Sequence, residues 1–148
     1  MKYSSTKVID LGSCAFRQPL ATSHCKRLHG YRLSAKFWFE ADKLDHLNWV
    51  VNFGGLKELK AELEMFFDHT TCIDREDPLL HMFMGLNAAG GCDLRIMDGV
   101  GIEKFAELCL TTADTFVRKI TKDRPEGICR CVQAEVWEHP QNSAIVKY

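Results

Sequence analysis

The sequence predicts an α+β fold in which one antiparallel β-sheet carries two helices packed on one face. Two observations lead to this prediction. Segments near both ends of the chain alternate apolar and polar residues, as a strand with one buried face does. Two segments between them repeat apolar residues at helical spacing. Strands grouped outside a pair of helices are typical of α+β proteins, and the long edges of such a sheet favour oligomerisation through sheet edges.

Length and composition indicate a single domain spanning residues 1–148. With 19 basic and 20 acidic residues, the net charge of -1 gives no reason to expect a nucleic-acid or membrane-surface partner. The seven cysteines are odd in number and include no Cys-x-x-Cys pair, which favours free thiols in a reducing compartment. Because the first residues lack the apolar segment of a secretory signal, and no apolar run could span a membrane, we expect a cytoplasmic protein.

The first strands are predicted before the first helix. Residues 7–16 are mostly apolar or small, and Gln18-Pro19 ends this strand because proline cannot donate to a sheet. Residues 31–40 alternate most clearly, which places one face of a strand on the core. Residues 49–53 are apolar and partly β-branched, so we expect a short strand that pairs back as a hairpin.

Two helices are predicted from the positions of their apolar residues. Gly54-Gly55 breaks the chain, and apolar residues then recur at helical spacing over residues 56–67 and again over residues 102–120. Asp77-Pro78 is expected to open a short helix that continues through Leu86. Three further strands are expected at residues 93–97, 128–138 and 143–148.

Reactive side chains are densest in residues 23–31. Cys25 lies in this polar segment beside two cations, and neighbouring cations lower the pKa of a thiol and favour the nucleophilic thiolate. His24 and His29 are close enough in sequence to be zinc ligands, although no third ligand lies nearby. The alternative interpretation is a partly exposed cysteine without a role.

Three carboxylates outside this segment are further candidates. Asp68 precedes His69 at the end of a predicted helix, where the pair could act as a general base, although the helix dipole alone also favours a histidine there. Glu138 ends a strand on its apolar face, where a carboxylate is costly unless it binds something, and an exposed strand-end glutamate is the alternative. Glu103 lies in the first turn of the long helix, where the dipole alone favours it.

Several of these segments together resemble the 6-carboxy-tetrahydropterin synthases and their relatives, the 6-pyruvoyl-tetrahydropterin synthases. Cys25-x-x-x-His29-Gly30 resembles the Cys-x-x-x-His-Gly-His signature of that family. Four more segments resemble, in order, its V-x-D-F-x-x-L-K, L-D-H, P-T-S-E and V-x-E-T-P motifs: residues 50–57, 63–69, 100–107 and 136–140. Because the order and spacing agree over most of the chain, the sequence is identified as a member of this family.

The resemblance implies the tunnelling fold, in which a sheet with two helices assembles through its edges into a homo-oligomer, a trimer or a hexamer. It also implies 7,8-dihydroneopterin triphosphate as substrate and a zinc ion held by three histidines. On this sequence, Cys25 would be the proton-transfer base, and Asp68 and His69 would complete the relay from a neighbouring subunit. Glu138 and Glu103 would bind the pterin substrate.

The chain departs from the family at the metal. Phe16 and Tyr31 stand at two of the three positions where the family has histidine, so that only His29 is retained. His24 is the candidate for a substitute ligand, and Tyr31 could supply an oxygen. Because these residues do not restore three histidines, zinc and the retro-aldol-type step that it supports stay open. The cations that could contact the triphosphate are Arg17, Lys26 and Arg27.

Three functions are therefore open from the sequence. The first is a 6-carboxy-tetrahydropterin synthase-like lyase in the route to 7-deazaguanine nucleosides such as queuosine, which the surviving cysteine, dyad and glutamate favour. The second is a metal-independent pterin aldolase or epimerase, because a base dyad can move protons next to a pterin ring without zinc. The third is a non-enzymatic pterin- or purine-binding protein, which the loss of two ligand positions favours.

Overall fold

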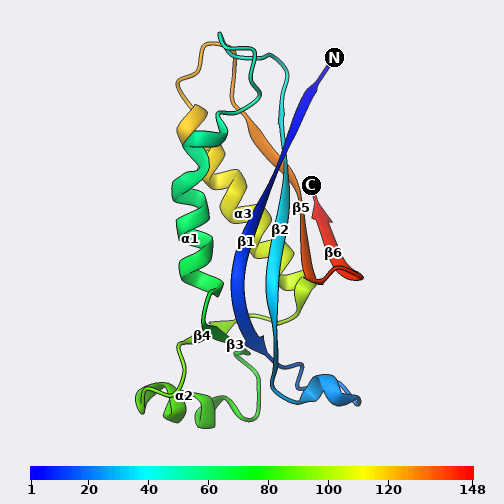
Figure 1. Ribbon diagram of the computed structural model, residues 1–148, viewed down its shortest axis with the longest axis vertical. Helices are drawn as coiled ribbons and strands as arrows, with labels where there is room; N and C mark the ends of the chain where they lie inside the picture. Colours follow the sequence, from blue (N-terminus) through cyan, green and yellow to red (C-terminus); the bar gives the residue numbers. More distant parts are fainter.

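The computed structural model describes residues 1–148 and shows one curled sheet with two long helices against one face (Figure 1). The strands are β1 (Tyr3–Phe16), β2 (His29–Ala41), β3 (Thr70–Asp74), β4 (Leu94–Met97), β5 (Arg130–His139) and β6 (Asn142–Lys147), in the spatial order β4-β3-β1-β2-β5-β6. The helices are α1 (Lys57–Phe67), α2 (Leu80–Ala88) and α3 (Ile102–Thr121), with short 3-10 turns η1 (His24–Lys26) and η2 (Phe53–Leu56). Helices α1 and α3 cover the sheet, whereas α2 projects at the lower end in Figure 1.

The sheet is mixed, so the expectation of an antiparallel sheet is correct for only part of it. Strands β1, β2, β5 and β6 pair antiparallel. Strand β3 runs parallel to β1, and β4 runs parallel to β3. The reason is the path of the chain. Helix α1 lies between β2 and β3, so the chain returns to the sheet beside β1, and α2 is the crossover connection that lets β4 run in the same direction as β3.

Most predicted elements are present, and two differ. Both long helices, the short helix and the strands near 93–97, 128–138 and 143–148 are observed within a few residues of their expected bounds. The hairpin strand expected at residues 49–53 is wrong: this stretch is irregular, with Asp45 accepting from the Trp49 backbone and Arg124 donating to the carbonyl of Val50. Strand β3 was not expected, because its five residues are nearly all buried and show no alternation.

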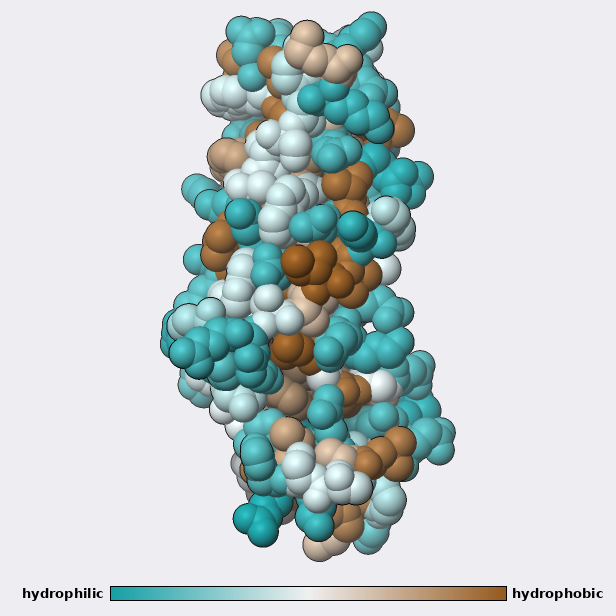
Figure 2. All heavy atoms as spheres, turned by 90° about the vertical axis from the view of Figure 1, so that its right-hand side faces the viewer, coloured by the Kyte–Doolittle hydropathy of each residue, from teal (hydrophilic) through white to brown (hydrophobic).

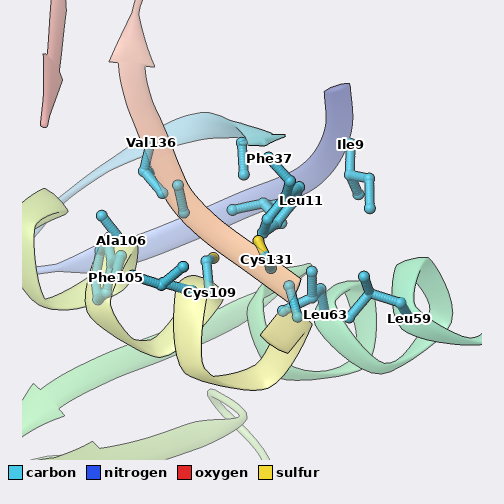
Figure 3. Close-up of a cluster of buried hydrophobic side chains, with 14 of the residues drawn as sticks. Ile9, Leu11, Phe37, Leu59, Leu63, Phe105, Ala106, Cys109, Cys131 and Val136 are labelled. Atoms are coloured by element: carbon cyan, nitrogen blue, oxygen red, sulfur yellow. The ribbon is translucent and has the colours of Figure 1, made fainter. Parts of the chain in front are cut away.

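The core lies between α1, α3 and the face of the sheet that they cover, called here the inner face (Figure 3). Alternate β2 residues from Leu33 to Phe39 are fully buried there, and the intervening residues point to the outer face. A bulge shifts the register of β1 between Asp10 and Gly12. The bulge lets Leu11 and Cys14, three residues apart, both reach the inner face.

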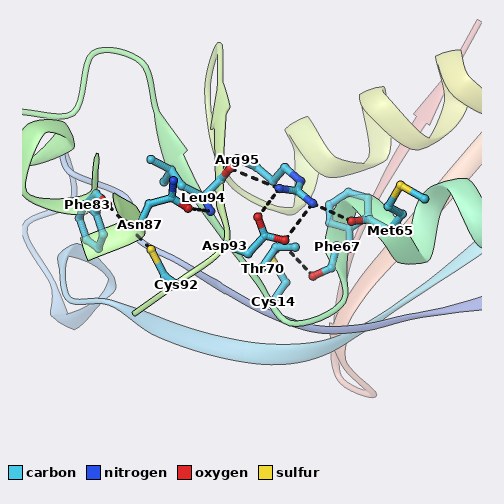
Figure 4. A network of polar contacts seen from close by, with 10 residues as sticks. All are labelled: Cys14, Met65, Phe67, Thr70, Phe83, Asn87, Cys92, Asp93, Leu94 and Arg95. Atoms are coloured by element: carbon cyan, nitrogen blue, oxygen red, sulfur yellow. Dashed lines mark hydrogen bonds and ion pairs between the residues drawn. The ribbon is translucent and has the colours of Figure 1, made fainter. Parts of the chain in front are cut away.

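A polar network fixes β3 and β4 to the end of α1 (Figure 4). Arg95 pairs with Asp93 at 2.6 Å and donates to the Met65 carbonyl of α1 at 2.9 Å. The Thr70 hydroxyl donates to the Phe67 carbonyl at 2.7 Å. These bonds span the two-residue turn between α1 and β3 and so hold its side chains in place. None of the helices combines the length and apolar character that a membrane-spanning segment needs.

Candidate active site

Four rings gather where β1, β2 and β5 reach the lower end of the sheet. Phe16, the last residue of β1, pairs with His29, the first residue of β2, and their ring centroids are 4.9 Å apart. Tyr31 lies 5.5 Å from His29 and 5.9 Å from His139 at the end of β5. We call Phe16, His29, Tyr31 and His139 the ring cluster. Because Tyr31 and His29 are in phase with the buried Leu33, the ring cluster continues the inner face beyond the core.

Cys25 approaches this cluster on the loop between β1 and β2. Its carbonyl accepts from the Gln18 backbone at 3.0 Å, and Ser23 caps η1 by accepting from the Cys25 N–H at 3.3 Å. The Gln18 side chain in turn donates to the Val100 carbonyl just before α3. The loop is therefore tied to the start of α3, the helix whose first turn carries Glu103 as an exposed side chain.

A buried ion pair anchors the same loop from the other side. Arg17 donates to Asp77 at 2.8 Å and to the Lys26 carbonyl at 2.9 Å, and the Asp77 side chain is fully buried. Arg17 is thus committed to the fold, which argues against its expected role as a triphosphate contact. Lys26 and Arg27 are exposed and keep that role open.

Replacing Asp77 with alanine is expected to lower the free energy of unfolding by about 3 kcal/mol, because it leaves the Arg17 guanidinium buried without its counter-ion. The Cys25 loop should also become more mobile, since Arg17 is one of its two links to the body of the protein, beside Gln18. Urea denaturation and amide exchange of residues 17–26 measure the two effects. A loss below about 1 kcal/mol, the size expected for an exposed pair, would contradict this interpretation.

The orientation of His29 is set by its neighbour. Its Nδ1 lies 2.7 Å from the Arg27 carbonyl, which can only accept, so Nδ1 carries the proton. In the neutral ring, Nε2 then keeps a free lone pair. His29 can therefore accept a proton or bind a metal through Nε2.

Glu138 completes this end of the inner face. It follows Val136 near the end of β5, where the pairing with β6 is irregular, its side chain is 19% exposed, and it accepts from Asn142 at 3.0 Å. Burial, with the neighbouring charges of Glu138 and Cys25, raises the pKa of Tyr31. The Tyr31 hydroxyl therefore lies within electrostatic reach of both Cys25 and Glu138.

The dyad of Asp68 and His69 is built into the turn between α1 and β3. Asp68 Oδ1 accepts from the Ser13 backbone at 3.0 Å and lies 2.9 Å from His69 Nδ1. The His69 backbone donates to the Ser13 carbonyl at 2.7 Å, with His69 in the left-handed region at a φ of 58°. A Cβ at Gly12 would overlap the Asp68 carboxylate, so this glycine makes room for the dyad. The prediction of an acid-oriented imidazole is consistent with this geometry.

The hydrogen bond from Ser13, and then the one from His69, holds the pKa of Asp68 below its usual range. A lowered folded-state pKa stabilises the fold above the unfolded pKa of about 3.9, and this stabilisation is lost as the pH falls through the folded value. We expect wild type to be more stable than Asp68→Asn near neutrality, with the difference shrinking below about pH 4. Denaturation at a series of pH values tests this, and a difference that does not shrink in acid would contradict it.

The dyad is not joined to Cys25 within one chain. Asp68 lies near Arg32 and Asp10, which pair at 2.6 Å on the outer face. The His69 side chain is 85% exposed, and His69 lines a depression of about 460 Å³ together with Arg32. Tyr31 also lines this depression, whereas Cys25 and Glu138 do not, so the dyad and Cys25 share no pocket within one chain.

The residues of this end do not fit a zinc ion held by three histidines. No group of three or more histidine, cysteine, aspartate or glutamate side chains is placed to hold a metal. Phe16 is 2% exposed and offers no donor, and the phenol of Tyr31 is a poor substitute for an imidazole. His24 is exposed on η1, outside the ring cluster. His24 and His29 are therefore not part of any group of three or more such side chains.

The sequence and fold can now be compared with known proteins. A family model described as 6-pyruvoyl tetrahydropterin synthase matches residues 9–148. The chain belongs to this family. Members of the 6-pyruvoyl tetrahydropterin synthase family are lyases, so the assignment supports a pterin-metabolising lyase. No curated protein matches the sequence significantly.

Solved structures of similar fold agree with this membership. An uncharacterized protein from Wolinella succinogenes has a TM-score of 0.80 at 18% identity, over 99% of this chain and 98% of that one. The 6-pyruvoyl tetrahydropterin synthase of Caenorhabditis elegans has a TM-score of 0.66 at 14% identity, over 100% and 96%. That of Plasmodium falciparum has a TM-score of 0.66 at 14% identity, over 98% of each chain. At these identities the similarity shows the fold, and the expected α+β family fold is confirmed.

One residue of the site was missed from the sequence. His139 stands where the motif of the 6-pyruvoyl tetrahydropterin synthase family has threonine, directly after Glu138. Its Nδ1 accepts from the Gln141 backbone at 3.2 Å, which leaves the proton of the neutral ring on Nε2, 3.9 Å from Glu138. The histidine in place of the threonine of the family motif is the feature of the sequence that could have pointed to this residue.

Proposed function

We propose that the protein is a 6-carboxy-tetrahydropterin synthase-like lyase that acts on 7,8-dihydroneopterin triphosphate, in the route to 7-deazaguanine nucleosides such as queuosine. The observation that carries the proposal is the convergence of Cys25, Tyr31 and Glu138 at one end of the inner face. A thiol, a hydroxyl and a carboxylate there can bind a pterin and move protons on its side chain.

Each side chain has a role in this proposal. The Glu138 carboxylate accepts hydrogen bonds from N–H groups of the pterin ring, which fixes the ring in the site. Cys25 takes a proton from a side-chain carbon that bears a hydroxyl group. Glu103, on the helix start tied to the Cys25 loop, is a second candidate contact to the ring. The exposed Lys26 and Arg27 are available to the triphosphate.

The dyad takes part from a neighbouring subunit of a homo-oligomer. Within one chain it lies with outer-face residues, away from Cys25. Figure 2 shows apolar side chains among hydrophilic ones along one side of the molecule. Val8 of β1 is 58% exposed and Ile145 of the edge strand β6 is 54% exposed, which suits association through the sheet. A trimer or hexamer in solution scattering would support this arrangement.

Incubation with 7,8-dihydroneopterin triphosphate, followed by mass spectrometry of the products, tests the proposal. The expected result is 6-carboxy-tetrahydropterin together with acetaldehyde, which carries the other two side-chain carbons, and free triphosphate, and loss of all three in Glu138→Gln. Binding of the pterin without turnover would instead indicate the non-enzymatic binding protein. Neither binding nor turnover would contradict a pterin-directed function.

A second candidate is a metal-independent pterin aldolase or epimerase. The observation in its favour is the ring cluster, in which Phe16 and Tyr31 replace two of the three expected histidines. Such an enzyme would act on 7,8-dihydroneopterin without the triphosphate. The same assay with this compound separates the two, because only the lyase requires a triphosphate leaving group.

A further inference from the structure

We propose that the Tyr31 hydroxyl, in place of a metal ion, binds a side-chain oxygen of the pterin substrate; this rests on the proposed pterin-directed function. Tyr31 is one corner of a triangle of rings with Phe16 and His29, whose centroids are 4.9, 5.5 and 6.0 Å apart. These are the three positions at which the resemblance implies metal ligands. Tyr31 therefore presents its hydroxyl where a metal-bound oxygen would be expected.

The Tyr31 ring is held on two sides while its hydroxyl is free. The edge of His29 meets it at 86°, and His139 packs against it from β5. Only burial and nearby charge act on the hydroxyl, with no hydrogen bond from within the chain. The hydroxyl oxygen is not among the buried polar atoms that lack a partner, so it is open to solvent and to a ligand. A ligand oxygen would satisfy it.

Phe16 offers no metal ligand at the third position, and its ring fills the space between His29 and helix α3. Its ring is 2% exposed and packs edge-on against Phe105 of α3 at 5.1 Å. It also contacts His29 at 4.9 Å, so no space is left beneath the two polar rings. His29 offers the lone pair of Nε2, as its bond to Arg27 requires. At these three positions the side chains thus offer one hydrogen-bond donor, the Tyr31 hydroxyl, beside one acceptor, His29 Nε2.

This pair suits the hydroxyl groups of a dihydroneopterin side chain. Tyr31 donates to one side-chain oxygen, and His29 Nε2 accepts from a side-chain O–H. Burial and the charge of Glu138 keep the phenol protonated at neutral pH, so it stays a donor. When Cys25 removes a proton from the adjacent carbon, negative charge grows on the oxygen, and the Tyr31 hydrogen bond becomes stronger.

The test compares two ligands in two tyrosine variants. Tyr31→Phe removes only the hydroxyl and keeps the ring contacts. We expect it to weaken binding of 7,8-dihydroneopterin about tenfold, and to change binding of 7,8-dihydropterin, which has no side chain, less than about twofold. Tyr3→Phe, a matched change at the far end of β1, should alter neither. Isothermal titration calorimetry gives all the dissociation constants.

A second measurement concerns the metal directly. Wild type purified without chelator should hold almost no zinc by elemental analysis, and dipicolinate should leave its affinity for 7,8-dihydroneopterin unchanged. Changing Phe16→His together with Tyr31→His restores three imidazoles, and this variant should take up about one zinc per chain. The zinc analysis and the dipicolinate measurement use the wild-type protein, so they hold even if the tyrosine variants fold poorly.

Two outcomes would overturn the inference. One is equal affinity of wild type and Tyr31→Phe for 7,8-dihydroneopterin. The other is about one zinc per wild-type chain whose removal abolishes that affinity. Absence of turnover with an intact difference between the two ligands would contradict the proposed lyase but not the role of Tyr31. Turnover that Tyr31→Phe leaves intact, with equal affinities, would contradict the role of Tyr31 but not the lyase.

Discussion

Replacing Cys25 with alanine is expected to lower turnover of 7,8-dihydroneopterin triphosphate about a thousandfold, because no other thiol is available at the site. Five of the other six cysteines are buried, and Cys92 is on the loop before β4. Affinity for the pterin ring should stay within about threefold, because Glu138 is untouched. Steady-state kinetics and calorimetry with the same protein separate the two effects.

Cys129→Ala is the matched control for this change. It also removes one thiol, but just before the start of β5, at the other end of that strand from Glu138. Its turnover should stay within about twofold of wild type, although it is buried and some stability will be lost. Equal losses of turnover in both variants would assign the Cys25 effect to folding and contradict a role in proton transfer.

Replacing Gly12 with alanine is expected to reduce the free energy of unfolding by about 4 kcal/mol and to displace the dyad. Gly12 has a φ of +86°, which an alanine adopts only with strain, and the added methyl group would overlap the Asp68 carboxylate. Moving Asp68 breaks its bond from Ser13 and its contact with His69. Thermal or urea denaturation measures the stability, and the pH titration of His69 by NMR follows the dyad.

Two further variants separate strain from overlap. Gly90 has a similar φ of +81° but open space around it, so Gly90→Ala should cost only about 1 kcal/mol. In an Asp68→Gly background, Gly12→Ala should cost about as little, because the Asp68 side-chain atoms that it would overlap, the Cβ atom included, are then absent. If Gly12→Ala costs as much with Asp68 removed as with it present, the overlap is not the cause.

The antiparallel part of the sheet and the helices could be predicted because their residues face two environments. In β2 each buried residue alternates with a less buried one, and α3 buries one stripe only, so both periods are visible in the sequence. Strand β3 has no such contrast because four of its five residues are buried. Residues 49–53 were wrongly predicted as a strand. Val50 and Val51 are buried, but the Val50 carbonyl accepts from the Arg124 side chain, and this stretch pairs with no strand.

The site was predictable residue by residue but not as an assembly. Cys25, His69 and Glu138 are polar groups whose local sequence gives each a chemical reason. That Tyr31 contacts His139 depends on β2 pairing with β5, across about 100 residues of chain, which no local pattern contains. The separation of the dyad from Cys25 likewise follows from the outer-face position of Arg32 beside Asp68.

At position 69 the residue that best suits the backbone conformation differs from the residue that supplies the imidazole. Non-glycine residues are uncommon in the left-handed region, although asparagine, aspartate and histidine are enriched among those found there, and His69 is held there between α1 and β3. A redesign guided by stability alone would choose glycine or asparagine at this turn and would remove the imidazole in doing so. Position 69 should therefore be kept fixed in any effort to make this protein more heat-resistant.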